Sequence, residues 1–113
     1  MGVFTREGVV NDIATAAERM GLDIEDLQEM IVDVLDDCIV KTEAILKAIQ
    51  EGDVTRIKAI AHDIKGSTAN YGLVQPSSLA LEIERHCESL PTKPTNELLE
   101  QLKELKTLDL DRD

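Results

Sequence analysis

The chain has 113 residues, an apolar content of 42%, one Phe, one Tyr and no Trp. This length predicts a single domain over residues 1–113, with a core filled by aliphatic side chains. The 12 basic and 23 acidic residues give a net charge of −11, which repels nucleic acid and anionic lipid surfaces. With no apolar run long enough to cross a bilayer and no secretory signal pattern, we expect a cytoplasmic protein without membrane insertion.

Helical periodicity begins in the first fifth of the chain. The spacing predicts a short helix over residues 11–20 that ends at Gly21 and covers one end of the fold. A long helix follows, with Asp23 as its N-cap and Gly52 at its end. The side chains that we expect this long helix to bury are Leu27, Met30, Ile31, Val34, Cys38, Ile45 and Ile49. Its outward face is strongly acidic, which is typical of a solvated surface.

Three more amphipathic segments follow. Asp53 caps the third predicted helix, "LVQPS" separates it from the fourth, and "LPTKPT" separates the fourth from the fifth. The expected inward residues of these three helices are Ile57, Ile60, Ile64 and Tyr71, then Leu79, Ala80, Ile83, Cys87 and Leu90, then Leu98, Leu102, Leu105 and Leu108. The pattern predicts an all-α fold, an antiparallel up-down four-helix bundle with a short additional N-terminal helix. Each stripe is narrow enough to be buried within one bundle, so we expect a monomer.

Cofactor chemistry has little support in the sequence. The two cysteines lie in apolar helical contexts and are expected to be free and buried. The two histidines and two cysteines share no spacing typical of metal ligands, so we expect no metal site and no intrinsic cofactor. The run "KGST" lies within a predicted helix rather than after a strand, and no phosphate-binding loop motif is present, which disfavours a nucleotide hydrolase or kinase.

His62 is the residue with the strongest chemical potential. At about 100° per residue, the apolar positions of its helix lie roughly 160–220° away from it, so the imidazole is predicted to face solvent. The same arithmetic places a group of small or apolar residues around the ring and two lysines on one flank. The surrounding residues are Ala59, Gly66, Ala69 and Leu73, and the lysines are Lys58 and Lys65.

Gly66 interrupts a helix at a cost of about 1 kcal/mol relative to alanine. Our interpretation is that it clears access to His62 for another molecule, while the lysines stabilise negative charge. The alternative is that Gly66 relieves a contact between helices. His86 lies beside the inward stripe of its own helix, and we expect a boundary position without a chemical role.

The segment "AHDIKGSTANYGL" resembles the phosphoacceptor motif of histidine-containing phosphotransfer (HPt) domains, and the flanking helices are similar in pattern over roughly three quarters of the chain. The resemblance implies that His62 is the phosphorylated residue, Lys65 a charge stabiliser, Gly66 the access residue and Ser67 a support for the turn. Ile64, Asn70 and Gly72 also match the motif. The exposed residues Lys58, Ala59, Ala69 and Leu73 would then join Gly66 and Asn70 in contacting the partner or the phosphoryl group.

The same resemblance implies a phosphorelay intermediate without enzymatic activity of its own. Such a domain takes a phosphoryl group from an aspartate of a response-regulator receiver domain and passes it to another receiver. Its partners would be receiver domains and a hybrid sensor histidine kinase, and Mg²⁺ would belong to the receiver. The alternative is a helical adaptor that binds a response regulator without carrying phosphate.

Overall fold

The computed structural model describes residues 6–107, and within them every regular element is helical. The elements are α1 (Arg6–Met20), α2 (Ile24–Glu51), α3 (Val54–Asn70), α4 (Val74–Arg85), the short 3₁₀ helix η1 (Cys87–Ser89) and α5 (Thr92–Lys106). The predicted all-α class is therefore confirmed. In this part of the chain, no helix combines the length and the apolar character needed to span a membrane.

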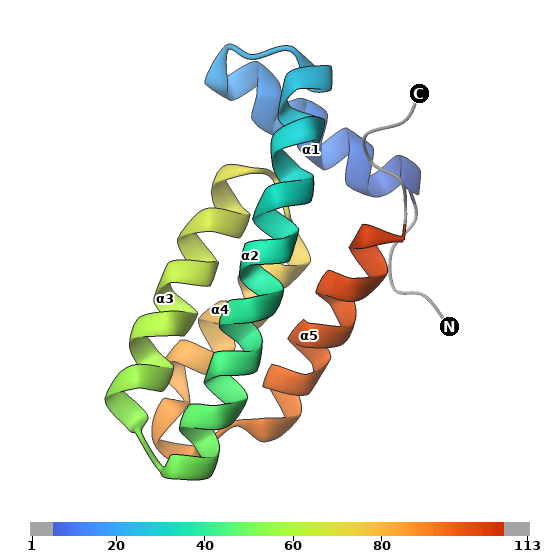
Figure 1. The fold of residues 1–113 in the computed structure, drawn as a ribbon. Coiled ribbons are helices and arrows are strands. Elements are labelled where there is room, and N and C mark those ends of the chain that lie inside the picture. The colour runs from blue at the N-terminus through green and yellow to red at the C-terminus, as the bar shows by residue number, and fades with distance from the viewer. Residues whose placement is uncertain (1–5, 108–113) are drawn as a thin grey trace.

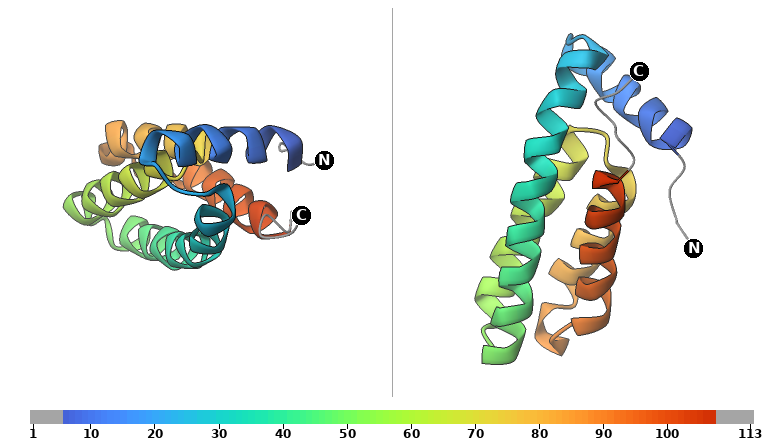
Figure 2. Two further views of the ribbon diagram at one scale, coloured as in Figure 1. Left: turned by 90° about the horizontal axis from the view of Figure 1, so that it is seen from above. Right: turned by 45° about the vertical axis from the view of Figure 1, so that its right-hand side comes forward.

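Helices α2 to α5 surround one aliphatic core. Helix α3 packs against α2 and α4, and α5 packs against the same two helices. Figure 1 shows α2 and α3 side by side with opposite chain directions, and Figure 2 shows the helices end-on around a shared interior. The fully buried large aliphatic side chains are Ile13, Leu27, Ile31, Leu35, Ile45, Ile57, Ile64, Ile83, Leu98, Leu102 and Leu105. Burial of these chains supplies most of the stabilising free energy, because apolar surface contributes about 25 cal/mol for each Å² removed from water.

Helix α1 crosses the end of the other helices at the turn between α3 and α4 (Figures 1 and 2). Gly72 permits this close approach, because it has a φ of +77° and a Cβ there would lie 2.5 Å from the backbone oxygen of Asp12. Arg19, in the last turn of α1, donates a hydrogen bond of 3.3 Å to the carbonyl of Asn70. The covering role expected for this helix is seen, but the helix starts at Arg6 rather than near residue 11.

Both proline-containing segments expected as breaks contain the start of the next helix. Pro76 and Pro94 each stand at the third residue of a helix, α4 and α5. A missing backbone N–H is tolerated in the first turn, because those N–H groups have no intrahelical acceptor. Pro76 and Pro94 therefore lie in the first turn of the next helix, whereas Pro91 lies in the connection before α5, where a break was expected.

Three expectations about burial are wrong. Met30 is 42% exposed because it lies about 100° around the helix from buried Ile31, at the edge of the stripe. Leu90 is 38% exposed because α4 ends at Arg85, and Leu90 follows η1 with a positive φ of 53°. His86 is exposed for the same reason, since it follows the last residue of α4. Leu108 lies outside the described residues.

Candidate functional site

His62 projects from α3 away from the core, as predicted. Its side chain is 67% exposed, whereas Ile57, Ala61, Ile64 and Thr68 form the buried face of the same helix. Asp53 caps this helix by accepting a hydrogen bond of 3.2 Å from the backbone N–H of Arg56. A regular helix from Val54 to Asn70 fixes the direction of the imidazole relative to the core.

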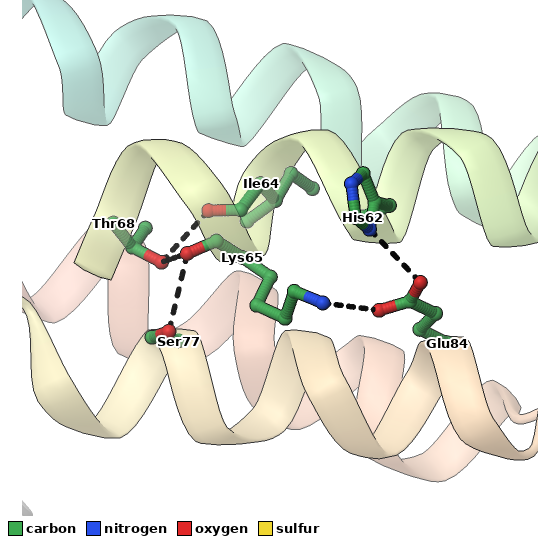
Figure 3. A network of polar contacts seen from close by, with 6 residues as sticks. All are labelled: His62, Ile64, Lys65, Thr68, Ser77 and Glu84. Carbon is green, nitrogen blue, oxygen red and sulfur yellow. Dashed lines mark hydrogen bonds and ion pairs between the residues drawn. The ribbon is translucent and has the colours of Figure 1, made fainter. Parts of the chain in front are cut away.

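Glu84 of α4 contacts both His62 and Lys65 (Figure 3). Its Oε2 lies 3.0 Å from Nδ1 of His62, and its Oε1 accepts a hydrogen bond of 2.9 Å from Nζ of Lys65. The Glu84 side chain is only 15% exposed, which limits its freedom to exchange these contacts for water. One carboxylate thus connects the candidate nucleophile with the candidate charge stabiliser.

The charge state of Glu84 decides which imidazole nitrogen is reactive. The hydrogen bond from Lys65 holds the pKa of the Glu84 carboxyl below its ordinary value, more strongly than burial raises it, and the His62 contact acts in the same direction. An ionised carboxylate only accepts hydrogen bonds, so Nδ1 of His62 carries the hydrogen in this contact. Nε2 of the neutral ring then holds the lone pair, and this atom points away from Glu84 in Figure 3.

A side-chain hydrogen bond between α4 and α3 holds this network in register, and a second hydrogen bond lies within α3. The Ser77 hydroxyl donates a hydrogen bond of 3.1 Å to the carbonyl of Lys65, and the Thr68 hydroxyl donates one of 2.7 Å to the carbonyl of Ile64 (Figure 3). Thr68 is fully buried and Ser77 is half-buried. The bond from Ser77 fixes the position of Lys65 along α4, which brings the lysine ammonium group to Glu84, two turns beyond Ser77.

Gly66 lies on the exposed face beside His62. A Cβ at this position would meet no atom within 4 Å, so the glycine relieves no contact between helices. The packing alternative for this residue is wrong. The open space around Gly66 agrees with the interpretation that this residue leaves room for an approaching molecule.

The remaining predicted residues divide by burial. Lys58, Ala59, Ala69 and Asn70 are exposed, Ser67 and Gly72 are half-buried, and Ile64 is fully buried. Leu73 is only 2% exposed, so its predicted place on the exposed surface beside His62 is wrong. The helical extrapolation fails there because α3 ends at Asn70 and Gly72 turns the chain with a positive φ.

Sequence reasoning missed Glu84, which is the closest charged partner of His62. A signal was present, because Glu84 stands four residues after Ala80 and three before Cys87, both of which are buried. An acidic residue at the edge of an apolar stripe predicts a specific cationic partner, since burying an unpaired carboxylate is costly. Periodicity could not name that partner, because the register between α3 and α4 is a tertiary property.

The two cysteines, Cys38 and Cys87, are free and buried, as expected. Burial and the nearby Asp37 raise the pKa of the Cys38 thiol to about 11, which makes it a poor nucleophile near neutral pH. Among the described side chains, no three His, Cys, Asp or Glu residues converge as the ligands of a metal ion would.

The model of the family described as Hpt domain matches residues 26–110 of this chain. The match includes α3, α4 and the whole network of His62, Lys65 and Glu84. No curated protein and no solved structure matches the chain significantly.

Proposed function

Because this chain belongs to the Hpt domain family, we propose that it carries a phosphoryl group on His62 between aspartates of two receiver domains. Hpt domains act in two-component phosphorelays as phosphocarriers rather than as catalysts. The observation that carries the proposal for this residue is the exposed imidazole whose Nδ1 is held by Glu84 at 3.0 Å. That contact leaves Nε2 as the free nucleophilic atom.

In the proposed step, the lone pair of Nε2 attacks the phosphorus of an aspartyl phosphate. The P–N bond forms as the bond between phosphorus and the aspartate oxygen breaks, and the carboxylate leaves with that electron pair. The ring gains positive charge as the bond forms, because Nδ1 retains its hydrogen. The carboxylate of Glu84 lies against this hydrogen and stabilises the charge. Transfer to the second receiver reverses these changes.

Lys65 has the role of neutralising the phosphoryl oxygens. Its ammonium group lies 2.9 Å from one oxygen of Glu84, and the other oxygen of the same carboxylate contacts His62. A flexible lysine side chain, 29% exposed, has the reach to turn from Glu84 toward a phosphoryl group on Nε2. Lys58 is exposed on the same flank and adds positive charge. The small residues beside His62 leave room for an approaching receiver. They are Ala59, Gly66 and Ala69.

The proposal also covers the fold of the domain, its partners and its oligomeric state. We assign the residues 1–113 to one domain in which α2 to α5 form an antiparallel up-down bundle, and the helix pairings support this assignment. The partners are receiver domains and a hybrid sensor histidine kinase, and Mg²⁺ is supplied by the receiver. The chain acts as a monomer in the cytoplasm, and sedimentation at micromolar concentration tests its oligomeric state.

The test is phosphoryl transfer from a panel of phosphorylated receivers encoded in the same genome. Wild type is expected to gain a phosphoramidate that is labile in acid and stable in alkali. The label is expected to disappear in His62→Gln and to persist in His86→Gln, the matched control, because His86 is exposed but has no carboxylate partner in residues 6–107. If no receiver labels the wild-type protein while receivers still bind to it, the adaptor function takes its place.

A further inference from the structure

A groove of about 390 Å³ lies between α3 and α4, next to the His62 network. Its basic residues are Lys58, Lys65 and Arg85, and its acidic residues are Glu84 and Glu88. Leu81 and Cys87 supply apolar surface. Lys65 and Glu84 belong both to the groove and to the network around His62, so the groove is continuous with the candidate site.

The groove is locally basic although the whole protein is acidic. Its three cations face two carboxylates, which gives one net positive charge, whereas the chain carries −11. Only Lys65 and Glu84 are paired with each other, and neither Lys58 nor Arg85 forms an ion pair with any residue between 6 and 107. Two exposed cations on opposite walls of one groove are therefore free to bind an anionic partner.

The other flank of His62 has the opposite sign. Asp63 of α3 and Asp37 of α2 share the single ammonium group of Lys41, each at 2.8 Å. This flank keeps one net negative charge, and the outward face of α2 adds further carboxylates. An anionic surface is attracted on the α4 side of His62 and repelled on the α2 side.

We propose that the α3–α4 groove is the docking site for an acidic segment of the receiver that exchanges phosphate with His62. Carboxylates of that segment bind Lys58 and Arg85, and an apolar side chain covers Leu81. The charge difference between the two flanks then orients the receiver across α3. The inference rests on the proposed phosphotransfer function, and it adds which side of His62 the partner occupies.

The test compares Arg85→Glu with Lys103→Glu in the full chain. Both residues are exposed and stand in the last turn of a helix, α4 and α5, so the two charge reversals act alike on net charge and on the helix dipole. For each variant, the rate of transfer from a phosphorylated receiver is divided by its own rate of labelling with phosphoramidate. This small donor gives its phosphoryl group to the imidazole with release of ammonia and needs no docking surface.

The normalised rate of Arg85→Glu is expected to fall about tenfold at low ionic strength, because charges at the edge of an interface act on association. The deficit is expected to shrink toward 1 M salt, where the screening length is about 3 Å. Lys103→Glu is expected to match wild type. An unchanged normalised rate for Arg85→Glu, or an equal loss in Lys103→Glu, overturns the docking site and leaves the proposed function intact. Absence of transfer from every receiver to wild type overturns both.

Discussion

The two flanks of helix α3 contain mirror-image polar contacts with different consequences. On the α4 side, one carboxylate, Glu84, is shared by His62 and Lys65. On the α2 side, one ammonium group, Lys41, is shared by Asp37 and Asp63. The shared Glu84 is 15% exposed, whereas the two aspartates are 58% and 63% exposed.

This difference separates chemistry from packing. Glu84 is largely shielded from water and touches the candidate nucleophile, so it selects the tautomer of the imidazole and lies where positive charge develops during transfer. Lys41 joins two helices through solvated carboxylates, and such ion pairs contribute about 0–1 kcal/mol. Substitutions on the two sides of α3 therefore have different expected effects.

Glu84→Ala is expected to slow phosphorylation of His62 about 100-fold, because the ring loses the contact that orients it and the tautomer is no longer fixed. Circular dichroism is expected to show an intact helical fold. Glu84→Gln is the matched variant, because an amide keeps the size and a hydrogen-bond acceptor but removes the charge. Its phosphorylation rate should lie between those of wild type and Glu84→Ala. Equal rates for wild type and Glu84→Ala contradict the role assigned to this flank.

Three glycine substitutions separate backbone strain and close packing from access to His62. Gly72→Ala is expected to destabilise the fold by roughly 2–3 kcal/mol, because its positive φ is unfavourable and its Cβ meets the backbone of Asp12. Gly52→Ala, with a positive φ but open space around it, should cost only about 1 kcal/mol. Gly66→Leu should not lower the unfolding temperature, because leucine favours the helix over glycine by roughly 1 kcal/mol and meets open space there, but it should slow receiver transfer. Normal transfer in folded Gly66→Leu contradicts the access interpretation.

Lys65→Ala is expected to lower the transfer rate about tenfold without abolishing the linkage, because the nucleophile remains and only charge stabilisation is lost. Lys41→Ala is its counterpart on the α2 flank, and we expect about 1 kcal/mol of lost stability with an unchanged labelling rate. Phosphoramidate labelling and urea unfolding of both variants measure the contrast. A loss of rate in Lys41→Ala as large as in Lys65→Ala removes the distinction between the flanks.

The smallest effect is a pH dependence of stability. The folded protein binds the Glu84 proton less readily than the unfolded chain, because the pKa of this carboxyl is lowered from 4.5. The stabilisation that the ionised Glu84 carboxylate contributes is therefore complete above pH 4.5. It is lost as the pH falls through the lower pKa of this carboxyl in the folded state. The difference in unfolding free energy between wild type and Glu84→Gln should decrease in this acidic range. A difference that does not decrease as the pH falls below 4.5 contradicts the charged state assigned to Glu84.

The features predicted correctly from sequence are those that depend on one helix alone. The direction of His62 follows from the 3.6-residue period, because α3 is regular from Val54 to Asn70. The same calculation gives the wrong direction for Leu73, because α3 ends before this residue. Glu84 was missed because its contacts depend on how far α4 is displaced along α3, and that displacement is set by packing and by bonds such as Ser77 to the Lys65 carbonyl.

The residues at which the helices begin were also only partly predictable from the sequence. Pro76 and Pro94 are compatible both with the segment after a helix end and with the first turn of the next helix, so local sequence alone does not decide between them. Helix α1 likewise begins at Arg6, and the local sequence did not mark that start. Local propensity therefore predicts the helices, and tertiary contacts decide where they begin and which side chains meet.

The most direct measurement is the position of the phosphoryl group on ¹⁵N-histidine-labelled protein, determined from ³¹P–¹⁵N coupling after transfer from a receiver. The structure predicts a single phosphoryl group on Nε2 of His62, because Glu84 occupies the Nδ1 side. A phosphoryl group on Nδ1 of His62, or on His86, contradicts the account.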